Sequence, residues 1–499
     1  MTTTQSSLAT NRQLSDSPTP TDIAVSLSQV SYTYSGYSES LAPGDVPASI
    51  TDVSFTARPG EITLLCGASG SGKSTVIRTI NGLATGFHDG HLDGDVIVNG
   101  TNMTEVELQD VCRLSATVFQ NPRTQFFTTD VRSEMALPLE NLGINPDLIR
   151  TRVANVARAS DLEWALDRSL ASLSGGQLQR VACSCAYCMD VPVLLFDEPT
   201  SNLDEESIDD FARLLGTLKQ SGAAIIVAEH RLHFLTELAD TVHRMKDGRL
   251  VETLTAAEFF SLSDNERRAR GLRALEIPET ELPQPEGEGL EISNIRFSYG
   301  NIEVLDIEHA VFPAGAVTIL SGSNGAGKTT LARILCGLAE PDSGGTIMLD
   351  GRRISARRRN STCAIVMQDV RRQLFAESVR DEVRLGQEKL CDEATADELL
   401  ARLDLTVCAD AHPLAISGGQ QQRLVIASAL ASRRRVVIFD EPTSGVDYGQ
   451  LTRIARLIKE LAATGTIVIV ITHDREFIAE CGDFEITLPK LHESSVSKG

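Results

Sequence analysis

Two glycine-rich stretches in this sequence lead directly into a lysine and a hydroxyl residue. Residues 67–75 read GASGSGKST and residues 322–330 read GSNGAGKTT. The first follows an apolar run, EITLLC, and precedes a run that predicts a helix, which is the context in which such a loop binds phosphate. The glycines let backbone N–H groups converge on phosphate oxygens, and the helix N-terminus adds partial positive charge. Because the motif occurs twice with downstream partners, a glycine-rich turn that binds nothing is disfavoured.

Each stretch supplies a full set of candidate ligands for a nucleoside triphosphate. We expect Lys73 and Lys328 to reach the β- and γ-phosphates, and the Ser74 and Thr329 hydroxyls to coordinate Mg²⁺. The predicted nucleotide-binding residues are Gly67, Ala68, Ser69, Gly70, Ser71, Gly72, Lys73, Ser74 and Thr75 in the first stretch and Gly322, Ser323, Asn324, Gly325, Ala326, Gly327, Lys328, Thr329 and Thr330 in the second.

Two neighbouring acids end an apolar strand in each half, within LLFDEPTSNLD (194–204) and VIFDEPTSGVD (437–447). Asp197 and Asp440 are placed to hold Mg²⁺, mostly through water. Glu198 and Glu441 follow, and they are candidates to orient or deprotonate an attacking water. An isolated acidic pair at a strand end is often only solvated, but the same pair in both halves favours chemistry.

A histidine and a serine-led motif also recur at fixed spacing. His230 and His473 each end a short apolar strand, 32 residues after the glutamate, and this equal spacing favours a γ-phosphate contact over a structural role. SLSGGQLQR (172–180) and ISGGQQQR (416–423) each begin a predicted helix, which the serine can cap while free N–H groups point at an anion. The residues concerned are Ser174, Gly175, Gly176 and Gln177, and Ser417, Gly418, Gly419 and Gln420.

The elements that must position these residues occur as an internal repeat. The offset between the halves is 255 from Lys73 to Lys328 and 243 from Ser174 to Ser417, so the first half has 12 extra residues between these motifs. Strand-like apolar runs alternate with helical stretches, which predicts a largely parallel α/β sheet in each half. We predict a first domain over 23–276, a solvated linker over 277–289 and a second domain over 290–490, with a disordered N-terminal tail at 1–22 and a C-terminal tail at 491–499.

The bulk composition limits the classes of partner. The chain has 499 residues, 42% hydrophobic and 23% charged, with a formal net charge of −22. This charge argues against nucleic acid as a partner, because binding it needs Lys and Arg to replace counterions. No apolar run approaches the roughly 20 residues of a membrane span. Cys183, Cys185 and Cys188 lack a paired cluster, so we expect a buried helix there and not a metal site.

The order of these motifs resembles that of the ATP-binding cassette (ABC) ATPases, over about residues 25–490. The resemblance implies two nucleotide-binding domains with the P-loop NTPase fold, each with a mainly parallel sheet core, an antiparallel β portion and a helical subdomain that carries the SGGQ signature. It implies ATP and Mg²⁺ as cofactors, with Gln120 and Gln368 among the metal ligands and Tyr34 and Tyr299 stacking on adenine. It also implies an intramolecular head-to-tail dimer, in which each signature closes over the ATP of the other cassette.

The segment VFQNPRTQFF (118–127) and the EHRL at 229–232 are similar to the energy-coupling factor and cobalt-uptake branch. That branch implies an ATPase on the cytoplasmic face of the membrane, where a transmembrane coupling subunit engages a membrane protein that captures a vitamin or metal ion. Tandem ATPases of sugar or other importers are the alternative. Translation or DNA-repair ABC proteins fit less well, because they carry a long charged linker or paired cysteines.

The segments after Gln120 and Gln368 carry residues beyond the nucleotide motifs. They are Arg123, Gln125 and Phe126 in the first half and Arg371, Gln373 and Phe375 in the second. Aromatics and arginines are the usual anchors of interfaces, so we expect these segments to dock the membrane subunit, with burial of the phenylalanines as the alternative. The five arginines of RRISARRR (352–359) predict a solvated surface, with contact to anionic lipid as the alternative.

Overall fold

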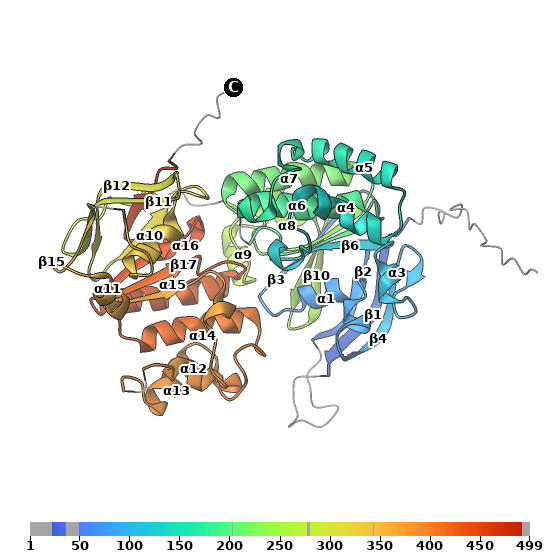
Figure 1. The fold of residues 1–499 in the computed structure, drawn as a ribbon. Coiled ribbons are helices and arrows are strands. Elements are labelled where there is room, and N and C mark those ends of the chain that lie inside the picture. Colours follow the sequence, from blue (N-terminus) through green and yellow to red (C-terminus); the bar gives the residue numbers. More distant parts are fainter. Residues whose placement is uncertain are drawn as a thin grey trace, which may run out of the picture.

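The structure of the chain is a computed structural model that describes residues 22–35, 49–201, 203–276, 280–342, 344–387 and 389–491. All but one residue of each predicted tail, and residues 277–279 of the predicted linker, lie outside these ranges. Figure 1 shows two folded units side by side, the first coloured blue to green and the second yellow to red. We call each unit a cassette and keep 23–276 and 290–490 as their proposed bounds.

The first cassette contains an antiparallel sheet and a mainly parallel one. The antiparallel sheet has the order β2(Ile50–Ala57), β1(Val25–Tyr34), β4(Gly90–Val98), β5(Thr101–Asn102). The second has the order β10(Arg249–Thr255), β9(Thr241–Lys246), β3(Ile62–Gly67), β8(Ala224–Ala228), β7(Val193–Asp197), β6(Ser115–Val118), in which only the β10–β9 pair is antiparallel. Its helices are α1(Lys73–Ile80), α2(Leu83–Gly86), α3(Leu108–Val111), α4(Val131–Asn141), α5(Pro146–Ala159), α6(Gly175–Cys188), α7(Glu205–Gln220), α8(Ala256–Phe260) and α9(Asp264–Ala269).

The second cassette repeats this plan. Its antiparallel sheet has the order β12(Ile302–Pro313), β11(Gly289–Tyr299), β14(Thr346–Leu349), β15(Arg352–Arg353). Its parallel sheet has the order β16(Cys363–Val366), β17(Val436–Asp440), β18(Ile467–Ile471), β13(Val317–Ser321), β19(Phe484–Thr487). Its helices are α10(Lys328–Leu335), α11(Ala356–Thr362), α12(Val379–Arg384), α13(Glu393–Arg402), α14(Gly418–Ala431), α15(Tyr448–Ala463) and α16(Arg475–Cys481).

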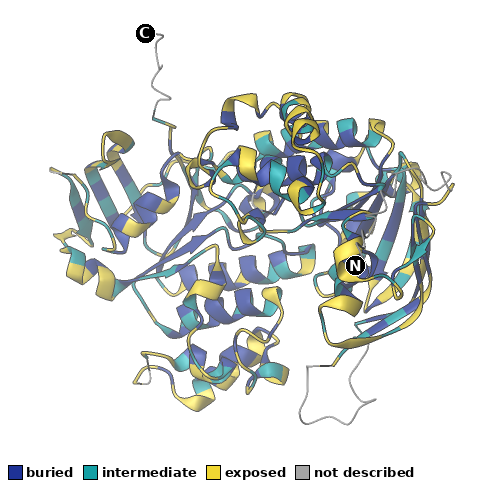
Figure 2. Cartoon of the chain, turned by 45° about the vertical axis from the view of Figure 1, so that its right-hand side comes forward, coloured by how far each residue is buried: buried dark blue, intermediate teal, exposed yellow. Residues whose placement is uncertain are grey.

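Burial follows from the apolar runs in the sequence. Strands β8 and β18 are buried along their whole length, as expected for parallel strands covered on both faces. Figure 2 shows the buried residues in the interior of both cassettes and the exposed ones on outer helices and turns. Cys183, Cys185 and Cys188 lie buried on α6 in apolar clusters, which confirms the predicted buried helix. Among the described residues, no helix is long and apolar enough to span a membrane.

The sheet order explains why distant motifs meet. Strands β6, β7, β8 and β3 are neighbours, and their carboxyl ends lead to Gln120, Asp197, His230 and the loop before Lys73. Ligands of parallel α/β sheets bind at this edge. The predicted α/β fold with two parallel cores, antiparallel portions and helical regions is confirmed.

Candidate nucleotide-binding sites

The two phosphate loops need glycine for steric reasons. Gly72 and Gly327 precede α1 and α10 with φ of 100° and 89°, a left-handed conformation that favours glycine. A Cβ on Gly67 would lie 2.2 Å from the Met245 carbonyl oxygen, and one on Gly322 would lie 2.6 Å from that of Leu488. The loops are therefore fixed by backbone packing beneath them.

A buried lysine lies inside each phosphate loop. Lys73 Nζ donates to the carbonyl oxygens of Gly67 and Ala68, at 3.1 Å each, and lies 3.2 Å from His230 Nε2. Lys328 repeats this arrangement with Gly322 and Ser323, and its Nζ lies 2.8 Å from His473 Nε2.

The hydroxyl of buried Ser71 has no hydrogen-bond partner among the described residues. A buried hydroxyl without a hydrogen-bond partner is unusual in a folded protein. These groups fit a polyphosphate, whose anionic oxygens would accept from the ammonium and hydroxyl groups.

Each site also joins a hydroxyl to a carboxylate, as a Mg²⁺ ligand set requires. Ser74 Oγ donates to Asp197 Oδ1 at 2.8 Å, and Thr329 Oγ1 donates to Asp440 Oδ2 at 3.0 Å. Burial, with Glu198 nearby, raises the pKa of Asp197 to about 6, and burial raises the pKa of Asp440. Mg²⁺ prefers such hard oxygen donors, so the residues present fit the ion.

The candidate catalytic glutamates are held in strained backbone next to the histidines. Glu198 and Glu441 have φ of 48° and 50°, and non-glycine residues in this region cluster at functional sites. His230 Nε2 lies 3.2 Å from Glu198 Oε1, and His473 Nε2 lies 3.9 Å from Glu441 Oε1. Burial raises the pKa of Glu441 to about 7.

Both histidines are held neutral. Burial, followed by the charge of Lys73, lowers the pKa of His230 to about 3, and burial with Lys328 lowers that of His473 to about 4. A neutral imidazole next to a lysine and a glutamate can donate a hydrogen bond to a terminal phosphate without adding a net charge to the site.

Two glutamines and two tyrosines were expected at the sites only because of the family resemblance, and they differ in their surroundings. Gln120 Nε2 donates to Glu198 Oε2 at 2.9 Å, so in this structure it contacts the candidate base. Gln368 follows β16 at the corresponding place. Tyr34 is half-buried on β1, with its ring edge-on to Tyr32 and its hydroxyl accepting from Arg78 Nη1 at 2.9 Å. Tyr299 is 52% exposed at the end of β11. Stacking of either tyrosine on adenine stays a prediction.

Two aspartates that the sequence reasoning missed connect the cassettes. Asp447 Oδ2 accepts from the backbone N–H of Ser69 at 2.7 Å, and Asp204 Oδ2 accepts from that of Asn324 at 3.3 Å. Each aspartate also caps a helix, α15 or α7, so each phosphate loop touches a helix start in the other cassette. The sequence repeat could have indicated them, because both aspartates end the duplicated DEPTSNLD and DEPTSGVD segments.

The signature serines form the predicted caps. Ser174 is the N-cap of α6 and Ser417 is the N-cap of α14, and each forms a reciprocal capping box with the glutamine three residues later. Both serines are exposed. Within the ranges that the structure describes, no hydrogen bond or ion pair joins either signature to the opposite phosphate loop, so that pairing stays a prediction.

The segments after Gln120 and Gln368 correct one prediction. Phe126 is partly buried against the core, whereas Phe127 is 84% exposed and Phe375 is 76% exposed. Phe126 corresponds to buried Leu374, and Phe127 is the counterpart of Phe375. The sequence pairing was wrong by one residue, because two adjacent phenylalanines in a loop do not reveal which one faces the core.

The two glutamines of these segments are also internal. Gln125 accepts from the N–H of Phe119 at 3.0 Å, and Gln373 accepts from that of Met367 at 2.8 Å. Their side-chain oxygens therefore shape the loops.

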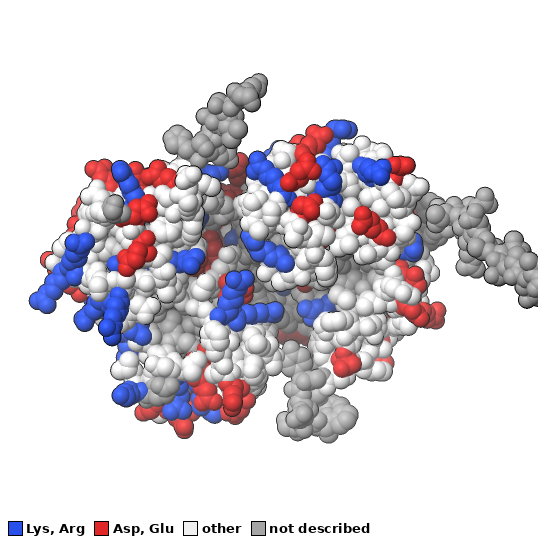
Figure 3. Space-filling view, viewed as in Figure 1, with Lys and Arg blue, Asp and Glu red and all other residues white. Residues whose placement is uncertain are grey.

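The arginine-rich segment 352–359 is only partly the solvated surface that was predicted. Arg352, Arg353, Arg357 and Arg358 are exposed, and Figure 3 shows Lys and Arg gathered at the left edge, over β15 and α11. Arg359 is 4% exposed instead, and its guanidinium donates to the Ile334 carbonyl oxygen and to Glu340.

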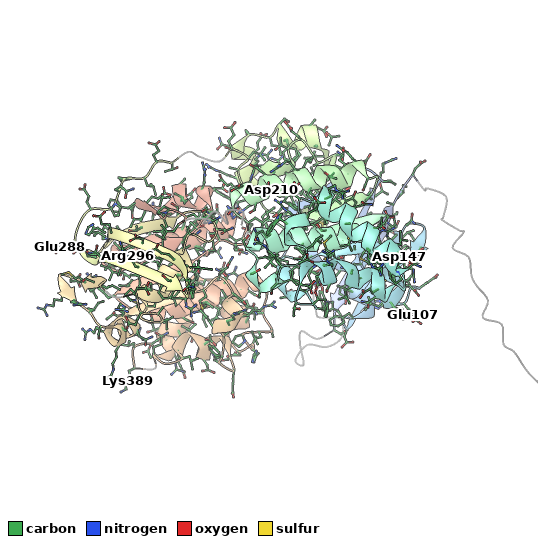
Figure 4. All side chains as sticks on the ribbon, turned by 45° about the horizontal axis from the view of Figure 1, so that its top comes forward. Glu107, Asp147, Asp210, Glu288, Arg296 and Lys389 are labelled. Atoms are coloured by element: carbon green, nitrogen blue, oxygen red, sulfur yellow. The ribbon has the colours of Figure 1, made fainter. Side chains whose placement is uncertain are left out.

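Many other charges face outward. Figure 4 shows labelled Glu107 and Asp147 at the outer edge of the first cassette, and Glu288 and Lys389 at that of the second. The described catalytic candidates, by contrast, are buried or half-buried.

Comparisons with known proteins agree with this geometry. A family model described as "ABC transporter" matches residues 50–201 and 306–444, and a model for an AAA domain matches 411–479. A Treponema denticola protein named "Putative ABC transporter ATP-binding protein" is 39% identical over 434 residues, covering 85% of this chain and 88% of that protein.

A Bacillus subtilis protein named "Putative HMP/thiamine import ATP-binding protein YkoD" is 30% identical over 468 residues, covering 87% of this chain and 85% of that protein. A solved structure described as ribosome-bound archaeal Pelota and ABCE1 is similar in fold, with a TM-score of 0.63 at 24% identity over 89% of this chain and 76% of that chain. The chain belongs to the ABC transporter family of ATP-binding proteins, as an ATPase with two cassettes in one polypeptide.

Proposed function

We propose that this chain is the energising subunit of an uptake system of the energy-coupling factor type, which imports a vitamin or metal ion. In this proposal it lies on the cytoplasmic face of the membrane and binds a transmembrane coupling subunit, which engages a substrate-capture protein. The Gln120 segment and EHRL support this branch, and one relative is named "Putative HMP/thiamine import ATP-binding protein YkoD".

The proposed chemistry uses the same residue roles in both cassettes. Bound Mg²⁺ would neutralise charge on the β- and γ-phosphates, held by Ser74 with Asp197 and by Thr329 with Asp440. Glu198 and Glu441 take the proton of the attacking water, and the raised pKa of Glu441, about 7, makes it a stronger base than an ordinary carboxylate. Lys73 and Lys328 hold the phosphates in place.

We further propose that each ATP site is completed by the other cassette. The Asp447–Ser69 and Asp204–Asn324 contacts already join each phosphate loop to the opposite cassette. In the nucleotide-bound state Ser417–Gln420 would face the first site and Ser174–Gln177 the second. The linker keeps the partner cassette at an effective concentration of roughly millimolar.

The observation that best supports the transport proposal is the pair of exposed phenylalanines in the segments that follow Gln120 and Gln368. Phe127 N–H donates to Glu134 Oε2 at 3.1 Å, and Phe375 N–H donates to Glu382 Oε2 at 2.7 Å. Glu134 and Glu382 are each 5% exposed, so a buried carboxylate fixes each loop while the ring projects outward. Exposed aromatics held on rigid loops are typical anchors for a protein partner.

Replacing Phe127 and Phe375 together by alanine tests this proposal. We expect co-purification with the transmembrane subunit from native membranes to fall at least about tenfold, as for loss of interface anchors. The melting temperature and the ATPase activity of the purified chain should stay near wild type.

Phe126→Ala is the matched control. Its ring is partly buried against the core, so the change should lower the melting temperature, by the equivalent of about 2 kcal/mol, which is less than for a fully buried ring. Undiminished co-purification by the double variant would reject the docking role of these loops.

A further inference from the structure

The end of the first cassette is buried against the second cassette beside His473. Arg273, four residues before the start of the linker, has a side chain that is 6% exposed. Its Nη1 and Nη2 donate to Asp474 Oδ1 at 2.9 Å and Oδ2 at 2.6 Å, and Nη1 also reaches Glu476 Oε2 at 3.2 Å. The Arg273 Nε donates to the Val446 carbonyl oxygen at 3.3 Å. A two-pronged pair of this kind fixes orientation as well as distance.

Asp474 connects this arginine to the loops around the second ATP site. It directly follows His473 and caps α16 by accepting from the N–H of Phe477. Thr443, two residues after Glu441, donates from Oγ1 to Asp474 Oδ2 at 2.8 Å. Arg273 therefore contacts the loop that carries His473, and through Asp474 it also reaches the segment that follows Glu441.

In the first site, the loop that carries His230 is held by residues of its own cassette. Thr200 is the counterpart of Thr443, and its N–H donates to Glu229 Oε1 at 3.0 Å. Glu229 precedes His230 and accepts that residue's N–H through Oε2 at 2.6 Å. Arg231 follows His230 and donates to the Leu203 carbonyl oxygen. Among the described residues, no charged side chain of the second cassette bonds to the loop that follows His230.

The charges explain why the second site needs a cation from outside. Asp474 is 6% exposed, and a buried carboxylate is strongly disfavoured unless it is paired. Burial opposes its ionisation, but Arg273 and then Arg231, both from the first cassette, hold its pKa below the ordinary value. Without Arg273, Asp474 would lose the cation that bonds it directly, and the loop that carries His473 would rearrange or take up a proton.

We propose that Arg273 is a positioning residue for the second ATP site and acts across the cassette boundary. It fixes Asp474 and thereby the His473 loop, so turnover at the second site depends on the first cassette's C-terminal segment. Turnover at the first site depends on it far less, because Glu229 holds the His230 loop internally and Arg273 reaches that site, among the described residues, only through the Val446 carbonyl, next to Asp447. This inference rests on the proposed two-site hydrolysis, which the experiment below tests separately.

The test isolates each site in the full chain. Glu198→Gln silences the first site and reports the second, whereas Glu441→Gln silences the second and reports the first. Arg273→Met is then added to each background, and ATPase rates are measured over a range of Mg-ATP concentrations. We expect kcat to fall about tenfold in the Glu198→Gln background, the order of loss from misplacing a catalytic group, with KM little changed. In the Glu441→Gln background kcat should change by less than about twofold, as for a residue outside that site.

Two further variants separate positioning from general stability. Arg475→Met breaks the exposed pair between Arg475 and Glu205, which also joins the cassettes, and it should leave both backgrounds near their starting rates. Asp474→Asn keeps the helix cap but removes the charge. Combined with Arg273→Met it should be little worse than the more damaging single change, because both act through one contact.

Three results would overturn the proposal: equal losses in both backgrounds, no loss in either, or additive effects of Arg273→Met and Asp474→Asn. If Arg273→Met lowers the melting temperature so far that rates cannot be compared, the Asp474→Asn variant is used alone. A loss of kcat confined to the Glu198→Gln background would support the proposal, and any other result would overturn it. Activity that survives in the Glu198→Gln, Glu441→Gln double variant would instead contradict the proposed hydrolysis mechanism.

Discussion

Buried ionisable side chains give this chain most of its chemistry, and they also make its stability depend on pH. His243 shows this away from the ATP sites. It is 3% exposed, its Nδ1 lies 3.0 Å from Thr253 Oγ1, and its ring lies 4.7 Å from that of Phe55. Burial lowers the pKa of His243 to about 4. Between about pH 6.5 and pH 4 the unfolded chain binds a proton here that the folded chain does not.

Because the folded-state pKa of His243 is depressed, the stability linked to it is full above about pH 6.5 and is lost as the pH falls toward 4. We expect His243→Gln to reduce the acid sensitivity of the first cassette. Between about pH 7.5 and pH 5 the variant should lose up to about 2 kcal/mol less stability than wild type. Thermal unfolding at both pH values measures this, and equal losses in the two proteins would contradict the assignment.

At the scale of elements, the aspartates that cap helices α7 and α15 each make two contacts. Each one caps its helix and also accepts from the opposite phosphate loop. Asp447 accepts from the N–H of Gln450 at 2.8 Å as a cap and from that of Ser69 at 2.7 Å across the cassettes. A change at this residue therefore affects both a helix and the contact between cassettes.

Asp447→Ala should lower the stability of the second cassette by about 1 kcal/mol, since the cap is lost, whereas Asp447→Asn should retain most of the stability because its side-chain oxygen still accepts. Melting temperatures of the two variants measure the difference. If the alanine and asparagine variants melt together, the cap is not what Asp447 contributes to stability.

Local patterns were sufficient to predict most elements of the candidate sites. The phosphate loops, the Asp–Glu strand ends and the serine caps are each set by residues within about ten positions of one another, so spacing reveals them. The duplicated order also predicted the fold, because each motif has its place on a parallel sheet.

What the sequence did not predict depends on distant contacts. Arg273 meets Asp474 across 201 positions, and nothing near Arg273 in the sequence indicates that partner. Arg359 looked like one more surface charge until α11 placed it against Glu340. The choice between Phe126 and Phe127 depends on how the loop turns, which Gln125 and Glu134 determine through backbone hydrogen bonds.

For the whole molecule, the central claim is that two cassettes in one chain form two ATP sites, each built from both halves. The cross-cassette contacts of Asp204, Asp447 and Arg273 show that the halves are joined next to those sites. We propose that Ser417 completes the site of Lys73 and that Ser174 completes the site of Lys328.

Steady-state ATPase rates of paired variants test this claim most directly. The single variants Lys73→Ala, Lys328→Ala, Ser174→Arg and Ser417→Arg are measured first, and at least one must retain activity for the pairs to be informative. Lys73→Ala with Ser417→Arg damages one site twice, so it should be little worse than its poorer single variant. Lys73→Ala with Ser174→Arg damages both sites, so its residual hydrolysis should nearly vanish. If Lys73 and Ser174 prove to be the redundant pair instead, each cassette works alone and the crossed arrangement is contradicted.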